Sequence, residues 1–151
     1  MAQLTFRNVD ASPAEPVERW PYEGLVAAIE RGQISHWARI AQAVRRDPWG
    51  QVARDVEAYA QYGDDDGVIS LLMESIRRAR AQAEKAERAE VARRVREAIA
   101  LSGLSAERFA KSVGTSASRL STYRSGAVTP SAAMLVRIER AGSRRRPTVR
   151  G

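Results

Sequence analysis

The pattern of apolar and polar positions is helical along most of the chain. Apolar side chains recur every three or four residues, and few stretches alternate apolar and polar residues as half-buried strands do. We therefore predict an all-α protein. Residues 1–19 look irregular because Pro13 and Pro16 interrupt them, and within this segment residues 4–6 have the pattern of a short edge strand.

The pattern predicts three short helices in an N-terminal module, residues 20–67. The first helix begins near Pro21, which suits a helix start because its ring fixes φ. Ser35 is the predicted N-cap of the second helix, and Asp47, followed by a proline, is that of the third. The connections are only a few residues long and the third helix ends near Gly63, which indicates a small helical bundle.

A long helical pattern follows, over residues 68–102. No proline or glycine interrupts it; it is rich in Leu, Met and Ile up to Ile76, and in Ala, Arg, Glu and Lys afterwards. We expect this segment to connect the N-terminal module to the C-terminal region, either as one continuous helix or as two helices with a joint. Its narrow stripe of alanines would support only a weak coiled coil.

The net charge of +7 is concentrated in one part of the chain. Residues 1–90 hold 12 basic and 15 acidic side chains, whereas residues 91–151 hold 13 basic and 3 acidic ones. A basic region joined to a mildly acidic one indicates that the basic region binds a partner, most often nucleic acid. The alternative is a solvated basic surface that ends in a disordered basic tail, residues 143–151.

The residue types that usually hold metals or small ligands form no convincing site. The chain has no cysteine and a single histidine, His36, which we expect at the surface. Three aspartates at positions 64–66 lack the spacing of a calcium loop and are interpreted as a solvated loop that caps the next helix. Trp20, Trp37 and Trp49 are interpreted as packing residues, with a ligand cage as the alternative. We predict no cofactor and no metal.

The C-terminal region, residues 91–142, is divided by residues that begin and end helices. Val95, Ile99 and Leu101 form the apolar face of a helix that Gly103 terminates. The pattern therefore predicts that the end of the long helical segment is also the first helix of a C-terminal domain.

Two short helices joined by a turn follow. Ser105 and Ser116 are the predicted N-caps of the two helices, and Gly114 supplies the turn between them. The second helix, Ala117–Ser125, ends at Gly126. Two helices joined by a glycine-containing turn predict a helix-turn-helix. A last helix is capped by Ser131, and the predicted inward residues of these three helices are Phe109, Ala110, Val113, Leu120, Tyr123, Met134, Leu135 and Ile138.

The spacing of these positions resembles the Cro/lambda-repressor type of helix-turn-helix protein, also called the XRE family, over residues 91–142. The resemblance implies a small residue where the two helices cross and a domain that binds double-stranded DNA in the major groove. The fold we expect is therefore a small N-terminal helical bundle joined by a long helix to a C-terminal helix-turn-helix domain of this type. The positions that carry the resemblance are Leu104-Ser105-x3-Phe109-Ala110-x2-Val113-Gly114-Thr115-Ser116-x3-Leu120-x2-Tyr123-x2-Gly126-x2-Thr129-Pro130-Ser131.

The resemblance also implies which residues touch DNA. The second helix of the motif would lie in the major groove, and Arg119 is its strongest candidate for base recognition because arginine can bind guanine with two hydrogen bonds. Residues around the turn and at helix N-termini would hold phosphates, which sets the register without reading the sequence. The predicted base contacts are Ala117, Ser118, Arg119, Ser121 and Thr122, and the predicted phosphate contacts are Ser105, Thr115, Ser116, Arg124, Arg144, Arg145 and Arg146.

The sequence departs from the family pattern in three respects. Ala106 stands where family members commonly have glutamine, so we expect that contact to be lost. The second helix of the motif is rich in small hydroxyl residues, which do not indicate one particular target sequence. The chain ends soon after the last predicted helix, where many relatives have a fifth helix. We therefore expect a homodimer formed through residues 20–90, and a tail that either contacts DNA or is solvated.

We predict a sequence-specific, double-stranded DNA-binding transcription regulator. The alternative is an antitoxin or a phage- or plasmid-immunity regulator whose N-terminal module binds a protein partner. We do not expect an enzyme, because no phosphate-binding loop, nucleophile motif or paired histidine and acid is present. The sequence lacks both an apolar run of roughly 18 residues and an apolar signal region, so we expect a cytoplasmic protein without a membrane partner. The abundant alanine and the preference for arginine over lysine resemble those of high-GC, actinobacterial proteins.

Overall fold

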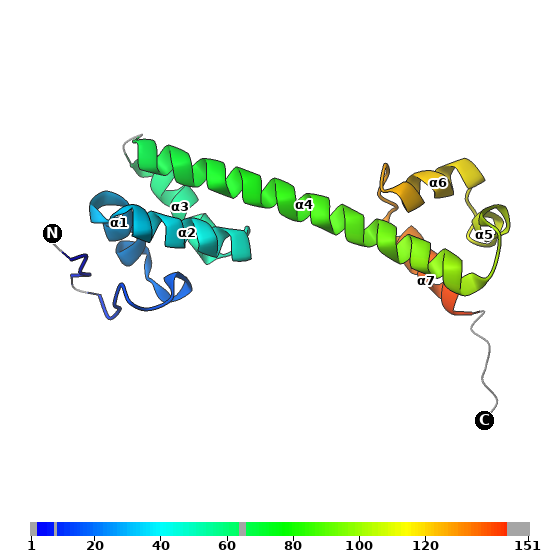
Figure 1. The fold of residues 1–151 in the computed structure, drawn as a ribbon, viewed down its shortest axis with the longest axis horizontal. Helices are drawn as coiled ribbons and strands as arrows, with labels where there is room; N and C mark the ends of the chain where they lie inside the picture. Colours follow the sequence, from blue (N-terminus) through cyan, green and yellow to red (C-terminus); the bar gives the residue numbers. More distant parts are fainter. Residues whose placement is uncertain (1–2, 8, 64–65, 145–151) are drawn as a thin grey trace, which may run out of the picture. The chain divides into compact units, whose positions relative to one another are not determined.

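The structure is a computed structural model that describes residues 3–7, 9–63 and 66–144. All regular secondary structure in these residues is helical (Figure 1), which confirms the all-α fold. None of the helices in these ranges combines the length and the apolar character that crossing a membrane requires.

The chain forms two compact units, residues 1–83 and 84–151. The first unit contains a short 3-10 helix η1 (Val17–Arg19), the helices α1 (Tyr22–Arg31), α2 (Ile34–Arg46) and α3 (Gln51–Tyr62), and the first part of α4 (Gly67–Ser102). The second unit contains the rest of α4 and the helices α5 (Ala106–Ser112), α6 (Ala117–Ser125) and α7 (Ala132–Ser143).

The core of the first unit is built from the apolar faces of its helices. Each fully buried aliphatic side chain stabilises the fold by about 1.5–3 kcal/mol, which offsets the loss of chain entropy. The larger aliphatic side chains of this core that are no more than 2% exposed are Leu25, Ile29, Ile40, Val44, Val56, Leu72 and Ile76.

Residues 4–6 form no strand, so the predicted edge strand is wrong. Side-chain packing holds this segment instead: the ring of Phe6 packs edge-on against Trp20, with the ring centroids 5.3 Å apart. An edge strand needs another strand to pair with, and the described part of the chain contains none.

The tryptophans of this unit differ in their surroundings. Trp20 is 6% exposed, and its indole N–H donates a hydrogen bond to a backbone carbonyl oxygen. The indole N–H of Trp37 likewise donates to the carbonyl oxygen of Ala28 over 2.9 Å. These two residues therefore pack within the unit as predicted. Trp49 is 44% exposed and lies at the surface.

The predicted start of α2 is wrong by two residues. The N-cap is Gln33, and α2 begins at Ile34, so Ser35 lies inside the first turn. The backbone N–H of Gln33 donates to Nδ1 of His36 over 3.0 Å, which closes a capping box. A glutamine–histidine pair thus takes the place of the serine cap that the sequence suggested.

The predicted start of α3 is also wrong. Asp47 and the proline after it do not begin the helix, because residues 47–50 form a turn in which Gly50 N–H donates to Asp47 O over 3.0 Å. Gly50 is the N-cap, and α3 begins at Gln51. The Asp-Pro pair begins a turn here, which is another common use of this dipeptide.

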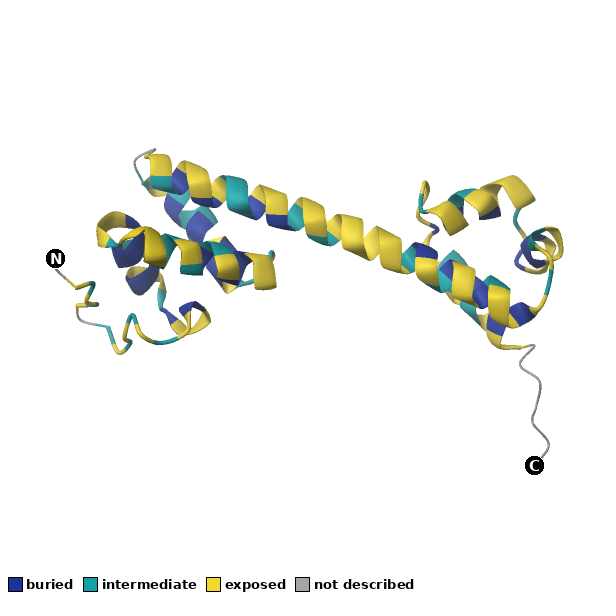
Figure 2. Cartoon of the chain, in the orientation of Figure 1, coloured by how far each residue is buried: buried dark blue, intermediate teal, exposed yellow. Residues whose placement is uncertain are grey.

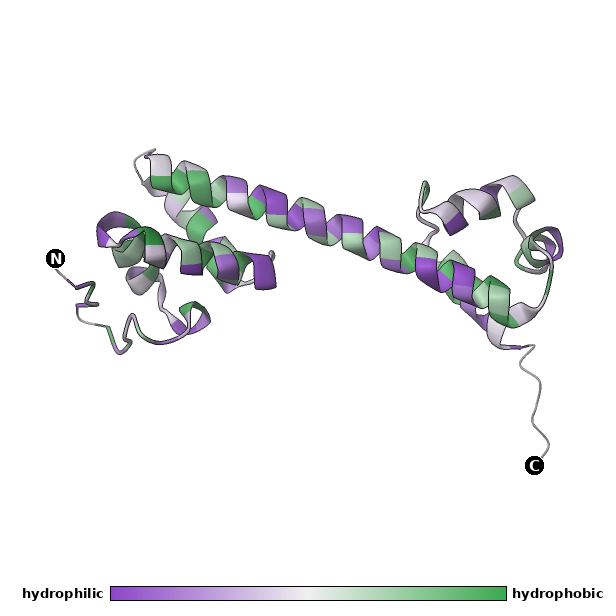
Figure 3. Cartoon of the chain, in the orientation of Figure 1, coloured by the Kyte–Doolittle hydropathy of each residue, from purple (hydrophilic) through white to green (hydrophobic). Residues whose placement is uncertain are grey.

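Helix α4 is one continuous helix, Gly67–Ser102. The Oδ1 atom of Asp66 accepts hydrogen bonds from the N–H groups of Val68 and Ile69 and so caps its start, while the other two aspartates of this loop lie outside the described residues. Residues 81–90 of α4 are exposed except at Ala83, and Figures 2 and 3 show this stretch as a mostly exposed, hydrophilic part of the helix.

The core of the second unit lies between α4, α5, α6 and α7. Leu101 is not part of it, contrary to prediction: it is 42% exposed, because it lies two residues, or about 200° around the helix, from Ile99. The core residues, none more than 8% exposed, are Val95, Ala98, Phe109, Ala110, Val113, Leu120, Tyr123 and Ile138.

Helix α7 approaches α4 closely at one glycine. A Cβ atom placed on Gly142 would lie 2.7 Å from the carbonyl oxygen of Ala98 and 2.8 Å from its Cα atom. These distances are shorter than any normal contact, so the position has no room for a side chain.

Candidate nucleic-acid interface

The turn between α5 and α6 contains a glycine in a left-handed conformation and is held to α5 by backbone hydrogen bonds. Gly114 has φ of 73°, a left-handed conformation that side chains disfavour. A hydrogen bond joins the turn to α5: the backbone N–H of Thr115 donates to the carbonyl oxygen of Ala110 over 3.0 Å. Ala110 itself is 1% exposed. The turn is therefore fixed at both ends.

Serine caps hold the starts of both helices, as predicted. The hydroxyl oxygen of Ser105 accepts a hydrogen bond from Arg108 N over 3.3 Å, and that of Ser116 accepts one from Arg119 N over 3.1 Å. At its other end α6 stops at Gly126, whose φ is 83°. These caps satisfy N–H groups that a helix start otherwise leaves without a partner.

Two buried side chains fix the face that α6 turns outward. Leu120 is 1% exposed and Tyr123 is 8% exposed, and both belong to the core of the second unit. Because these two residues take up one side of the helix, the opposite side faces solvent. Ala117, Ser118, Arg119 and Ser121 are exposed, and Thr122 is half-buried.

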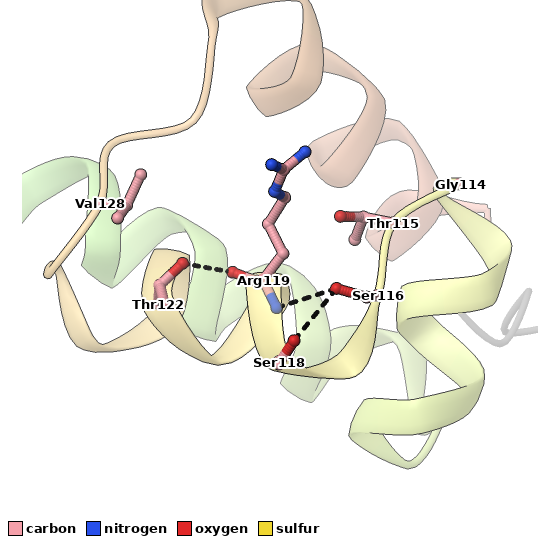
Figure 4. A pocket seen from close by; sticks show the side chains of 7 residues that line it. All are labelled: Gly114, Thr115, Ser116, Ser118, Arg119, Thr122 and Val128. Carbon is pink, nitrogen blue, oxygen red and sulfur yellow. Dashed lines mark hydrogen bonds between the residues drawn. The ribbon is translucent and has the colours of Figure 1, made fainter.

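The outward side of α6 borders a shallow hollow of about 810 Å³. Figure 4 shows the side chain of Arg119 extending into this hollow, between Thr115 of the turn and Val128 of the loop after α6. A guanidinium placed on a concave surface can meet a convex partner with its donors directed outward. The hollow is lined by Gly114, Thr115, Ser116, Ser118, Arg119, Thr122 and Val128.

Three of the four hydroxyls that line the hollow, those of Ser116, Ser118 and Thr122, are already engaged within the domain. Thr122 Oγ1 donates to the carbonyl oxygen of Arg119 over 2.6 Å, and the hydroxyls of Ser116 and Ser118 lie 3.3 Å apart (Figure 4). A hydroxyl that donates in this way keeps its lone pairs, so these groups can still accept hydrogen bonds from a partner. The arginine is the strongest donor in the hollow.

The hollow brings together five of the predicted contact residues: Thr115, Ser116, Ser118, Arg119 and Thr122. The remaining predicted residues do not line it. Ser105, Arg124 and Arg144 are exposed elsewhere on the second unit, Ala117 and Ser121 lie along α6, and Arg145 and Arg146 lie outside the described residues.

Two arginines that the sequence did not single out hold the motif in place. Arg96 of α4 donates from Nη1 to Arg124 O at the end of α6 over 2.9 Å. Arg137 of α7 donates from Nη1 to Val113 O over 3.1 Å. Cations suit helix C-termini because the last carbonyls carry partial negative charge. No spacing rule relates positions so far apart, so only the fold reveals these contacts.

No candidate metal site accompanies this surface: within the described ranges, no group of three or more histidine, aspartate or glutamate side chains is arranged to hold an ion. In a comparison with known families, residues 93–142 match the family model described as helix-turn-helix. No curated protein and no solved structure matches the chain.

Proposed function

We propose that this chain, whose residues 93–142 are a helix-turn-helix domain of the Cro/C1 type (XRE family), is a sequence-specific transcription regulator that binds double-stranded DNA. The observation that carries the proposal is the position of Arg119. It lies exposed on the outward side of α6, and its side chain extends into the hollow beside the turn (Figure 4).

In the proposed complex, α6 lies in the major groove and reads bases. Arg119 binds a guanine through its O6 and N7 atoms, which accept from two guanidinium N–H groups. Ser118, Ser121 and Thr122 offer hydroxyls to base edges, and Ala117 can contact a thymine methyl group. Arg119 contributes most to discrimination, because each good bidentate pair is worth about 1–3 kcal/mol against the wrong base.

Phosphate contacts fix α6 in the groove. Thr115 and Ser116 at the turn, Ser105 at the start of α5, and Arg124 near the end of α6 are the proposed contacts. These contacts position α6 but do not distinguish one base from another, because the phosphates are the same at every base pair.

The test is binding of the full chain to duplexes enriched from a random library, compared with duplexes of random sequence. For the enriched duplexes, Arg119→Ala should lower the affinity by about 10- to 100-fold, and it should change affinity for random duplexes far less. Arg140→Ala is the matched control: this arginine is exposed on α7 and its side chain forms no hydrogen bond or ion pair within the described part of the chain. If enrichment fails, or if Arg119→Ala and Arg140→Ala behave alike, the proposed function or the reading helix is wrong.

We further infer that the regulator is a homodimer formed through residues 20–90. A dimer places two reading helices in successive major grooves, about 34 Å apart. The support is a set of large apolar side chains exposed in this range, which a dimer contact would remove from water. The most exposed are Tyr62 at 87%, Ile34 at 77% and Leu71 at 57%.

The same apolar side chains also suit the second candidate, an antitoxin or immunity-type regulator that binds a protein partner through this module. Measurement of molar mass in solution separates the two. A homodimer gives twice the chain mass of 16.7 kDa at micromolar concentration, and Tyr62→Ser with Leu71→Ser lowers it to one chain. A monomer at every concentration favours the second candidate.

A further inference from the structure

A row of basic side chains on α4 lies beside the end of α6. Lys85 and Arg88 precede the residues that the family model matches, and Arg96 follows its start. All three line one depression of about 240 Å³ in the second unit. The other residues that line it are small: Ala89, Ala92, Ser125 and Gly126.

Two other arginines in this part of α4, Arg93 and Arg94, form ion pairs with glutamates, unlike these three cations. Arg93 forms ion pairs with Glu90 over 2.8 Å and with Glu97 over 2.9 Å. Arg94 pairs with Glu139 of α7 over 2.5 Å. Neighbouring carboxylates therefore balance the charge on the other sides of the helix.

The basic row has no such partners. In residues 3–7, 9–63 and 66–144, no carboxylate pairs with Lys85 or Arg88, and neither side chain forms a hydrogen bond. Arg96 bonds only to the carbonyl oxygen of Arg124, a neutral group that leaves its positive charge uncompensated. Positive charge without an ion-pair partner, gathered on one side of a helix, is the feature that attracts an anionic partner.

Helix geometry keeps the row on one side of α4. Lys85, Arg88 and Arg96 are separated by three and eight residues, so they point within about 80° of one another around the helix axis. From the first to the last the helix rises about 16 Å. Glu84 stands one turn before Arg88, yet the two form no ion pair in the structure. A linear array of cations of this length matches a linear array of anions.

The end of α6 is fixed against this row. A Cβ atom on Gly126 would lie 3.5 Å from Cβ of Ala92, an ordinary van der Waals distance, so the two backbones come close. The hydrogen bond from Arg96 to Arg124 O ties the same two helices together. Any polyanion that α6 contacts near its C-terminal end therefore passes near the row.

We infer that Lys85, Arg88 and Arg96 bind the phosphate backbone of the DNA duplex, outside the residues matched by the family model. The inference rests on the proposed function. A duplex strand carries one negative charge per about 3.4 Å of helix axis, so several phosphates fall within the length of the row. The small residues Ala89 and Ala92 leave the space between the cations open to the sugar-phosphate chain. The row holds DNA without reading its sequence.

The test uses the full chain with Lys85→Gln and Arg88→Gln combined, leaving Arg96 in place because it also caps α6. Affinity for a random-sequence duplex is measured by fluorescence anisotropy between about 50 and 200 mM salt. The double variant should bind about tenfold more weakly, and the slope of log affinity against log salt should fall by about 1.8, which is 0.9 for each lost phosphate contact. Affinity for enriched and random duplexes should fall by the same factor.

The matched control is Arg77→Gln with Arg93→Gln, which removes two charges from exposed arginines of the same helix that are paired with glutamates. The control should keep the wild-type slope. If wild-type protein binds DNA and the two double variants behave alike, the inference is wrong and the proposed function stands. If wild-type protein binds neither duplex, the proposed function is wrong and the inference falls with it.

Discussion

Arg137 of α7 donates a hydrogen bond from Nη1 to the carbonyl oxygen of Val113, 3.1 Å away, at the residue where α5 ends. The contact joins the last helix of the domain to the turn that precedes α6. Arg137→Ala should destabilise the protein by about 1 kcal/mol, the usual net value of a single hydrogen bond. Urea unfolding measures this value, and Arg140→Ala on the same helix should change it by less than about 0.5 kcal/mol. Equal effects would mean that the contact contributes nothing specific.

The close approach of Gly142 to Ala98 predicts that a single added methyl group is costly. Gly142→Ala should destabilise by about 1–3 kcal/mol, because its Cβ would lie 2.7 Å from a backbone oxygen that cannot move alone. Gly67→Ala is the control for this substitution, because a Cβ atom added at Gly67 would have no other atom within 4 Å. It should be neutral or slightly stabilising. Thermal and urea unfolding of both variants check the difference.

A side chain at position 126 should carry a conformational cost in the backbone rather than a steric clash. Its φ is 83°, and the nearest atom to an added Cβ is 3.5 Å away, so space is available but the backbone is unfavourable for a side chain. Gly126→Ala should cost about 1–2 kcal/mol in the free energy of unfolding. Gly126→Asn should cost less, because asparagine tolerates the left-handed region. Equal losses in the two variants would contradict this explanation.

A substitution at Ser116 should separate the stability of the protein from its affinity for DNA. An aspartate caps a helix as well as a serine does, so Ser116→Asp should keep the stability within about 0.5 kcal/mol of wild type. Its negative charge would face the proposed phosphates, and DNA affinity should fall at least about tenfold. Ser131→Asp makes the same change at the N-cap of α7, away from the hollow, and should bind DNA almost as wild type does. If both variants bind equally well, the interface is misplaced.

Glu74 predicts a pH dependence of the first unit. Hydrogen bonds from Arg77 and Arg78 lower the pKa of Glu74 from 4.5 to about 2. A depressed carboxyl pKa stabilises the folded state fully above the unfolded value, and this contribution is lost as pH falls from about 4.5 through about 2. NMR titration of Glu74 should show the low pKa, and Arg77→Gln should raise it. An unchanged pKa in that variant would show that Arg77 is not its cause.

Local signals predicted most of the C-terminal domain. Ser105, Ser116 and Ser131 each accept a hydrogen bond at the start of a helix, as their positions suggested. Gly114 and Gly126 both have positive φ. These features depend on residues only a few positions apart, and such short-range chemistry can be predicted from sequence.

Predictions from the sequence were wrong or incomplete in two situations. In one, alternative local structures have similar energies; in the other, contacts with distant residues determine the structure. A proline after Asp47 suits a helix start and a turn equally, and the structure uses the turn. The contacts of Arg96 and Arg137 join helices 28 and 24 residues away, so no local pattern could reveal them. The basic row on α4 was hidden for a different reason. Glutamates stand at helical spacing from both Arg88 and Arg93, and only the folded chain shows that Glu90 pairs with Arg93 whereas Glu84 leaves Arg88 unpaired.

The reading surface and the supporting core of α6 are separate sets of residues. Leu120 and Tyr123 belong to the core, whereas Ser118, Arg119 and Ser121 are absent from it and exposed. In the proposed complex, exchanging the exposed set would change which bases α6 contacts and would leave in place the core residues that hold the helix. If α6 reads DNA as proposed, new binding preferences would arise from substitutions at these few exposed positions, while the core that stabilises the domain stays the same.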